Sequence, residues 1–338
     1  MTSPFTPYLQ QALSRDAVSA EDITTAFDIM LKGEVDPIQA GAFLAALKVR
    51  GETQTEIAAA ATAMRATAIS FEGPDGAVDT CGTGGDGANT YNISTATAIV
   101  LAACDVPVAK HGNKAVSSAS GSSDVLSALG VDISISPDKA EACLNAIGIA
   151  FLFAPNHHPA VKHVAPVRAA LGVRTLFNLL GPLTNPAGAR RQLLGVYDKS
   201  LMVPIAETLK ALGAVSAWVV HGDDGLDELT VTGPSHVAIL RDGSVVNRTL
   251  TPAEAGLSRH DADALVGGDA TTNADALRAL LDGDKNAYRD AVLLNAAAGL
   301  IVAGKDEDLA PGAQRAAHAI DSGAAKEKLN ALIQYTAS

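Results

Sequence analysis

Hydrophobic positions in the first 70 residues follow a helical spacing, with apolar side chains at i, i+3 and i+4. Ser19 precedes one such run and Pro37 begins another, and both residue types are typical of helix starts. Gly33 and Gly51 follow the ends of two runs. The pattern predicts four short helices without strands, at 7–13, 21–31, 37–50 and 55–68.

The spacing changes near residue 76, where apolar runs of strand length begin to alternate with helical segments. The predicted strands lie at 78–81, 106–111, 133–136, 150–153, 193–197 and 217–222. The predicted helices between them lie at 93–104, at 120–129, from Pro137 onward and at 199–212. This alternation is typical of a parallel sheet covered by helices.

The end of the chain completes this pattern. Residues 235–250 predict two strands around the turn Asp242-Gly243, and residues 273–335 are mostly helical. We therefore predict an α/β protein with a small N-terminal all-helical domain and a larger α/β domain. The helical domain spans residues 1–72, and residues 73–338 form a mostly parallel central sheet flanked by helices.

Composition restricts the classes of function. Hydrophobic residues make up 48% of the 338 positions, enough for a sizeable core. The net charge of −12 argues against a general nucleic-acid surface or an anionic-membrane surface, although a small anion site needs only a few local donors. No signal segment or uncharged run of the ~18 residues that a membrane span needs is visible. The three scattered cysteines are typical of a reduced, cytoplasmic protein.

Residues 79–95 carry the strongest chemical signal, because a short strand, a glycine-rich turn and an apolar helix follow one another. A turn with so little side chain lets backbone N–H groups approach a ligand closely, and the helix N-terminus adds partial positive charge. The stretch therefore predicts a phosphate-binding loop. Its glycines are Gly82, Gly84, Gly85 and Gly87.

Two other interpretations of this turn remain. Three of its glycines match the G-x-G-x-x-G fingerprint of dinucleotide sites. Such a site needs an acid at the end of the second strand, but here that strand runs into Lys110 and His111, and Asp105 precedes it. A dinucleotide site is therefore disfavoured, and a purely structural turn is the other alternative.

Residues 110–123 predict a second loop that faces an anion. Lys110, His111 and Lys114 supply donors and positive charge, and Asn113 can both donate and accept. The serines that follow make the loop rich in hydroxyl groups. Ligands of parallel sheets bind beyond the carboxyl ends of the strands, so we expect both loops to face one ligand. A solvated serine-rich loop is the alternative.

An acidic loop follows the predicted strand at 217–222. Asp227 and Glu228 are adjacent, and we favour them over Asp223 and Asp224 as magnesium ligands. Carboxylate oxygens hold Mg²⁺ while substrate phosphates complete its shell. The alternative is an ordinary solvated turn.

The segment 154–190 supplies further candidates. Arg168 and Arg174 can each bind a carboxylate through the planar guanidinium fork. His157, His158 and His163 suggest a metal site, but their spacing does not place three ligands on one helical face. Histidines that cap helices or line a channel are the simpler interpretation.

Together these features favour a phosphorylated sugar that carries a pyrophosphate leaving group, with Mg²⁺ on the pyrophosphate. The chain has no G-x-x-x-x-G-K-[ST] motif of a P-loop kinase and no G-x-S-x-G motif of a nucleophilic serine. Displacement at the sugar carbon needs charge stabilisation and positioning more than covalent help.

Four ordered stretches, 79–95, 110–130, 157–186 and 225–228, resemble the anthranilate phosphoribosyltransferases of tryptophan biosynthesis. The resemblance covers nearly the whole chain. It implies transfer of the phosphoribosyl group of phosphoribosyl pyrophosphate (PRPP) to the amino group of anthranilate, giving N-(5-phosphoribosyl)anthranilate and pyrophosphate. The rivals are a pyrimidine nucleoside phosphorylase-like enzyme, which would lack residues 225–228, and a non-catalytic nucleic-acid-binding relative, which the net charge disfavours.

The resemblance also implies an arrangement. Helices near 160–185 would complete the N-terminal domain, the site would lie in the cleft between the domains, and two copies would pair through the helical domain. It implies Mg²⁺ as cofactor, held near Ser94, Asp227 and Glu228. His158 would line the channel for the aromatic acid.

The implied substrate contacts follow residue by residue. Anthranilate would contact Gly82, Asn113 and Arg168. PRPP would contact Gly82, Gly85, Asp86, Thr90, Asn92, Ile93, Ser94, Thr95, Lys110, His111, Gly112, Asn113, Lys114, Ala115, Val116, Ser117, Ser118 and Ser122. The chain departs from the family at Lys114, where arginine is usual; lysine keeps the charge but lacks the planar fork.

Overall fold

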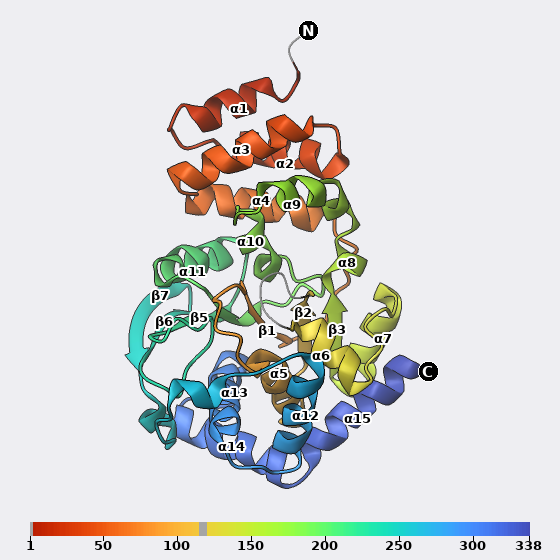
Figure 1. Ribbon diagram of the computed structural model, residues 1–338, viewed down its shortest axis with the longest axis vertical. Coiled ribbons are helices and arrows are strands. Elements are labelled where there is room, and N and C mark those ends of the chain that lie inside the picture. The colour runs from red at the N-terminus through yellow and green to blue at the C-terminus, as the bar shows by residue number, and fades with distance from the viewer. Residues whose placement is uncertain (1–2, 115–119) are drawn as a thin grey trace.

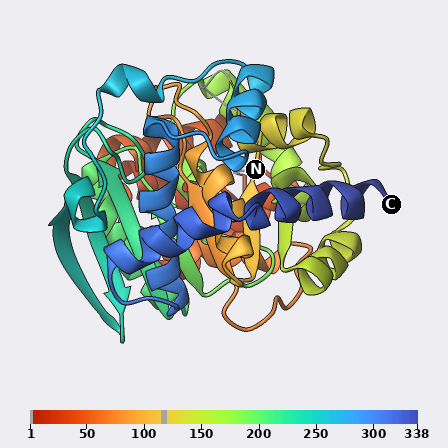
Figure 2. The same cartoon turned by 90° about the horizontal axis from the view of Figure 1, so that it is seen from below.

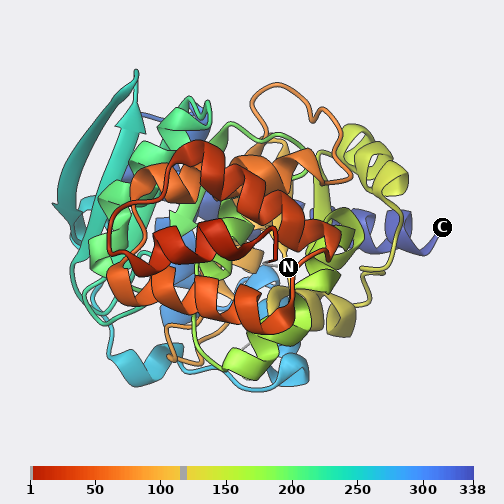
Figure 3. The ribbon, with the colours of Figure 1, turned by 90° about the horizontal axis from the view of Figure 1, so that it is seen from above.

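The computed structural model describes residues 3–114 and 120–338. Four N-terminal helices stack above a larger body, in which helices cover both faces of a seven-stranded sheet (Figure 1). Seen from above, these four helices lie across the top of the α/β body (Figure 3). They are α1 (Thr6–Leu13), α2 (Ala20–Lys32), α3 (Pro37–Arg50) and α4 (Gln54–Ala66), so the four predicted helices are confirmed.

Local side chains explain where these helices begin. The Ser19 hydroxyl caps the start of α2, and the Asp36 carboxylate caps α3, with Pro37 as its first residue. Thr53 and Glu56 form a reciprocal capping box at α4. Such contacts join residues two or three positions apart, so the sequence alone could predict these starts.

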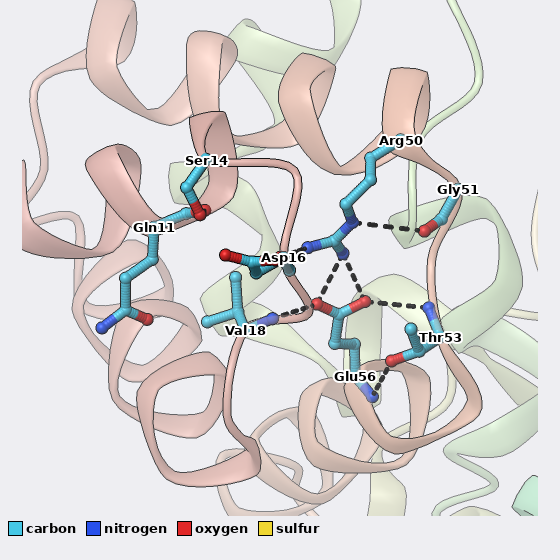
Figure 4. A network of polar contacts seen from close by, with 8 residues as sticks. All are labelled: Gln11, Ser14, Asp16, Val18, Arg50, Gly51, Thr53 and Glu56. Atoms are coloured by element: carbon cyan, nitrogen blue, oxygen red, sulfur yellow. Dashed lines mark hydrogen bonds and ion pairs between the residues drawn. The ribbon is translucent and has the colours of Figure 1, made fainter.

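Glu56 is fully buried and also connects the helices to one another (Figure 4). Its carboxylate accepts hydrogen bonds from the main-chain N–H groups of Val18 and Thr53, both at 2.8 Å. The Arg50 guanidinium donates to the same carboxylate and to the main-chain oxygen of Asp16. This network ties the α1–α2 connection to the ends of α3 and α4.

We expect Glu56→Ala to lower the free energy of unfolding by about 3–5 kcal/mol, because it leaves the largely buried Arg50 guanidinium and two N–H groups without their partner. Urea unfolding measures the change. Asp28→Ala is the control, since it breaks only the exposed Lys32–Asp28 pair and should change the value by less than about 1 kcal/mol. Similar losses in both variants would contradict this role of Glu56.

The sheet is mostly parallel, as predicted. Its spatial order is β3-β2-β1-β4-β5-β6-β7, in which the first five strands run parallel and β6 and β7 form an antiparallel hairpin. The strand order reverses at β1, which pairs with β2 on one side and β4 on the other. The strands are β1 (Val78–Gly82), β2 (Val108–Gly112), β3 (Ile149–Phe153), β4 (Arg191–Gly195), β5 (Ser216–Gly222), β6 (Ser235–Arg241) and β7 (Ser244–Leu250).

Side chains alternate between two cores along the central strands, as the strand period requires. Leu193 and Trp218 face a core shared with the C-terminal helices, which cross the side seen from below (Figure 2). Leu194 and Val219 face a second core, shared with the N-terminal helices and α11 (Met202–Ala211). The helices of the first core are α5 (Ile93–Ala103), α6 (Ser122–Leu129), α7 (Pro137–Ile147), α12 (Ala270–Leu281), α13 (Ala287–Ala303), α14 (Leu309–Asp321) and α15 (Ala324–Ala337).

The connection from β3 to β4 returns to the N-terminal helices. Val167 and Phe177 join their core, and the Phe177 ring lies 5.2 Å from that of Phe27. These contacts agree with helices near 160–185 as part of the N-terminal domain, while the boundary at residue 72 stays a prediction. The connection consists of α8 (Ala154–His157), η1 (Pro159–His163), α9 (Ala165–Leu171), α10 (Phe177–Leu180) and η2 (Gly181–Leu183).

The predicted strand at 133–136 is wrong. The Asp132 carboxylate accepts hydrogen bonds from the N–H and hydroxyl groups of Ser134, at 2.8 and 2.6 Å, and Ser136 caps α7. These polar side chains bind the local backbone, which favours a turn over pairing with another strand.

Three further short helices are η3 (Lys199–Leu201), η4 (Pro252–Ala255) and η5 (Ala262–Leu265). Across residues 3–114 and 120–338, none of the helices has the length and apolar character that crossing a bilayer requires.

Candidate active site

Three predicted loops meet beyond the carboxyl ends of the central strands. The glycine loop follows β1, the second loop follows β2, and the acidic loop follows β5. Parallel strands end at the same edge of a sheet, and β1 lies at the reversal of strand order, where ligands of such sheets bind. The order of the strands therefore brings the three loops of the candidate site to the same edge of the sheet.

The glycine loop has the backbone geometry that its sequence predicts. Gly84, Gly85 and Gly87 have φ values of 65°, 79° and 77°, a region in which side chains are strained. The loop leads into Asn92, the N-cap of α5, so the N–H groups of the first helical turn, which have no partner within the helix, follow directly on the glycine turn. Main-chain donors with so little side chain around them suit a phosphate.

The remaining predicted residues of this loop divide between site and core. Ile93 and Thr95 are buried and belong to the core beneath the loop. Thr90 forms an isolated bridge with Val266 at the far end of the loop. The Asp86 carboxylate accepts a hydrogen bond from a main-chain N–H group two residues later.

The acidic loop lies directly against the glycine loop. Asp227 Oδ2 accepts a hydrogen bond from the Gly84 N–H group at 2.7 Å, and Glu228 Oε1 accepts one from the Ser94 N–H group at 3.1 Å. The Ser94 N–H group lies in the first turn of α5, where main-chain donors commonly hold anions, and the Gly84 N–H group lies in the glycine turn. The structure thus brings Ser94, Asp227 and Glu228, the three predicted metal residues, together.

Two glycines at strand ends make room for this contact. A Cβ atom on Gly82 would overlap the Asp227 carboxylate. A Cβ atom on Gly195, the last residue of β4, would overlap the main chain of Asp227. The main chain of the acidic loop therefore crosses the end of β4 where a side chain would otherwise stand.

The other two acids of the loop have different partners. Asp223 is exposed and lies 3.1 Å from the His236 ring. The Asp224 carboxylate accepts hydrogen bonds from the hydroxyl groups of Thr230 and Thr232, at 2.5 and 2.6 Å. Asp224 thus shapes the loop, whereas Asp227 and Glu228 face the space beside the glycine turn.

Burial raises the pKa of Asp227 to about 7 and that of Glu228 to about 8. The neighbouring carboxylates add to both shifts, Asp86 for Asp227 and Asp227 for Glu228. Burial and mutual repulsion disfavour the charged forms of both carboxylates. A divalent cation would stabilise these charged forms and lower both pKa values again. The residues present therefore fit Mg²⁺, which takes one or two carboxylates beside water and phosphate oxygens.

The second loop begins with two buried side chains of β2. Lys110 Nζ donates to the main-chain oxygen of Thr80, so its charge lies beneath the glycine turn. His111 Nδ1 lies 3.0 Å from the Gly181 oxygen. Burial lowers the pKa of His111 to about 3, so its imidazole is neutral.

The rest of the second loop lies at the strand end. Asn113 and Lys114 are exposed, and the Ser122 hydroxyl at the start of α6 donates to the Asn113 oxygen at 3.4 Å. Gly112 packs so closely on Phe151 that a Cβ atom would lie 2.6 Å from its ring. Four predicted contacts, Ala115, Val116, Ser117 and Ser118, lie outside the described residues.

Two predicted arginines belong to the β3–β4 connection, and of these Arg174 lies against the glycine loop. The Arg168 guanidinium lies 5.4 Å from the Phe177 ring centre, and that of Arg174 lies 4.0 Å from the Tyr197 ring centre and against Gly85. Within residues 3–114 and 120–338, neither guanidinium has a hydrogen bond or ion pair. Both are therefore able to bind an anion.

The three histidines of this connection point in different directions. His157 Nδ1 lies 2.9 Å from the Ile69 oxygen, and His163 lies beside Gly33. The His158 ring lies 5.1 Å from that of His111, and burial lowers its pKa to about 4. In the described part of the chain, no group of three or more His, Cys, Asp or Glu side chains is arranged as a metal site.

Two buried asparagines that the sequence analysis missed hold the loops from below. Asn273 of α12 donates to Asn92 Oδ1 and to the Ser120 hydroxyl, both at 2.9 Å, and so joins the glycine loop to the second loop. Asn295 of α13 bonds the main chain of Leu229, beside the acidic pair. Asn295 could have been noticed, because a polar side chain within an apolar helix needs buried partners.

Comparisons with known proteins agree with this geometry. Residues 6–68 match a family model described as the helical bundle domain of a glycosyl transferase family, and residues 74–326 match the a/b domain of that family. Anthranilate phosphoribosyltransferase of Azospirillum brasilense is 56% identical over 330 residues, which cover 98% of this chain and 92% of that protein. The chain belongs to the anthranilate phosphoribosyltransferase family.

Solved structures of anthranilate phosphoribosyltransferases have the same fold. The structure from Thermus thermophilus is 44% identical and superposes with a TM-score of 0.93, covering 98% of this chain and 99% of that chain. The structure from Saccharomyces cerevisiae in complex with PRPP and Mg is 29% identical, with a TM-score of 0.91 and coverage of 100% and 99%.

Proposed function

We propose that this chain transfers the 5-phosphoribosyl group of PRPP to the amino group of anthranilate, releasing pyrophosphate, in tryptophan biosynthesis. One observation carries the proposal: the acidic pair lies against the phosphate-binding N–H groups of the glycine turn and of α5. Membership of the anthranilate phosphoribosyltransferase family supports the identity of both substrates.

PRPP is held by main-chain donors of both loops in this proposal. The turn around Gly85 and the first N–H groups of α5 bind its phosphate oxygens, and Lys110 contributes positive charge from below. Ser122 and Asn113, which are hydrogen-bonded to each other, form the side of the PRPP site that belongs to the second loop. The proposed PRPP contacts among described residues are Gly82, Gly85, Asp86, Thr90, Asn92, Ile93, Ser94, Thr95, Lys110, His111, Gly112, Asn113, Lys114 and Ser122.

Asp227 and Glu228 are the proposed magnesium ligands, together with the Ser94 hydroxyl. Bound Mg²⁺ supplies positive charge that stabilises the leaving pyrophosphate. The chain itself positions the reactants: the glycine loop and α5 hold the donor, while Asn113, Gly82 and Arg168 orient anthranilate at the sugar carbon. The aromatic amine is neutral at pH 7, so no strong base is needed before attack.

Arg168→Ala should raise the KM for anthranilate by at least about tenfold, because the carboxylate loses a charge-assisted, bidentate partner. The KM for PRPP should change little. Steady-state kinetics with each substrate varied measures both values. Arg168→Lys keeps the charge without the fork and should lie between wild type and Arg168→Ala. An unchanged KM for anthranilate would refute this role of Arg168.

Product fluorescence tests the proposed function directly. The purified chain with PRPP, anthranilate and Mg²⁺ should form fluorescent N-(5-phosphoribosyl)anthranilate and an equal amount of pyrophosphate. The same chain with a pyrimidine nucleoside and inorganic phosphate should release no base. Phosphorolysis without transfer to anthranilate would overturn the proposal in favour of a phosphorylase.

We also propose that the chain is cytoplasmic and that its domain boundary lies at residues 72/73. We further propose that two copies pair through the N-terminal helices. Three apolar side chains of α1 and α3 support this pairing surface, because they are 62%, 81% and 89% exposed: Leu13, Ile38 and Val49. Three free cysteines support a reducing compartment. Light scattering of the full chain tests the pairing, and a monomeric mass at micromolar concentration would contradict it.

A further inference from the structure

We infer that Asn295 of α13 is a positioning residue that fixes the proposed magnesium ligand Glu228 by clamping the main chain of Leu229. This inference rests on the proposed function, because it assigns a role within the same site. Asn295 lies below the acidic loop and does not belong to either substrate-binding loop.

The Asn295 side chain makes a reciprocal pair of hydrogen bonds with one residue. Its Oδ1 atom accepts from the Leu229 N–H group at 3.1 Å, and its Nδ2 group donates to the Leu229 oxygen at 2.8 Å. Nδ2 also donates to the Ala291 oxygen one helical turn earlier, at 2.9 Å. Asn295 is only 2% exposed, so these bonds are shielded from water.

The carboxamide satisfies both main-chain groups of Leu229. Leu229 is fully buried and follows the end of β5, where the chain has left the sheet, so its N–H and C=O groups have no neighbouring strand. Only a side chain that both donates and accepts can satisfy the two groups at once. Asn295 thus supplies the two hydrogen bonds that a neighbouring strand would otherwise provide, and it fixes the position of the main chain directly after Glu228.

A small cavity lies beside the acidic pair. This cavity between α5, the strand ends and α13 is lined by Ser94, Asp227, Glu228 and Asn295, among others. Without the clamp, the main chain of Leu229 loses the two bonds that fix its position, and Glu228 beside it can shift away from the Ser94 N–H group. A shift of ~1 Å is enough to spoil a metal-binding geometry.

Asn295→Leu tests the inference, because it keeps the approximate size of the side chain and removes all three of its hydrogen bonds. Calorimetric titration with Mn²⁺ and pyrophosphate measures metal binding without turnover. We expect the Kd for Mn²⁺ and the Mg²⁺ concentration for half-maximal transfer to rise at least about tenfold, with the KM for anthranilate unchanged.

Val302→Ala is the matched control. It truncates a fully buried side chain two turns further along α13 and should lower thermal stability without changing metal binding. If Asn295→Leu does not fold, Asn295→Ser takes its place, since its hydroxyl is neutral and too short to keep both hydrogen bonds to Leu229.

The outcomes separate the two proposals. Metal constants within about twofold of wild type in the Asn295 variant, or equal shifts in Val302→Ala, would overturn the positioning role. Absence of transfer by the wild-type chain would instead overturn the proposed function, and the Mn²⁺ titration would still decide the role of Asn295.

Discussion

Replacing Gly195 with alanine is expected to lower kcat/KM for PRPP at least about 100-fold, comparable with the loss of a transition-state-stabilising group. The new Cβ atom would overlap the main chain of Asp227, which cannot rotate away as a side chain can. The acidic loop would have to lift from the end of β4, and both carboxylates would leave the donors of Gly84 and Ser94. Steady-state kinetics at a series of Mg²⁺ concentrations measures the loss.

Gly233→Ala is the control for this variant. Gly233 lies a few residues after the acidic pair, and a Cβ atom there would meet no atom within 4 Å. It should keep activity within about twofold of wild type. Near-normal activity of Gly195→Ala at ordinary Mg²⁺ concentrations would show that the loop does not need this position.

The double variant Asp227→Asn, Glu228→Gln is expected to lose at least about 1,000-fold in activity and all dependence on Mg²⁺. The amides keep an acceptor for the Gly84 and Ser94 N–H groups, so the loop should keep its fold. Transfer rates with and without a chelator measure the effect. Asp223→Asn, at the exposed acid of the same loop, should leave magnesium dependence unchanged.

The same double variant should be more stable than wild type in metal-free solution at alkaline pH. The folded-state pKa values of Asp227 and Glu228 are raised from 3.8 and 4.5 to about 7 and about 8, so folding disfavours their charged forms. Wild-type stability therefore falls as pH rises from about 4 to about 8, and the variant escapes this loss.

Melting curves from about pH 4 to about pH 9 in a chelator measure this difference. The advantage of the variant should vanish below about pH 4, and Mg²⁺ with pyrophosphate should stabilise the wild-type chain only. A variant that melts below wild type at alkaline pH would contradict a metal site and indicate a purely structural carboxylate pair.

The candidate site was predictable where its chemistry lies within one short stretch. The glycine loop, the Lys110 loop and the pair Asp227–Glu228 are each continuous in sequence, and strand ends position all three. The turn at 133–136 was mistaken for a strand because Asp132 and Ser136 bond their own backbone, which apolar spacing does not reveal.

The sequence by itself determined the helix starts, the change to alternating strands and helices, and the positions of the three loops, because these depend on neighbours a few residues apart. Only the tertiary structure decided which distant groups meet. Gly84 bonds Asp227 across 143 positions, Leu229 bonds Asn295 across 66, and Asn273 bonds Asn92 across 181. These contacts depend on how the strands and helices are arranged in space, with β1 between β2 and β4, and no local pattern records that arrangement.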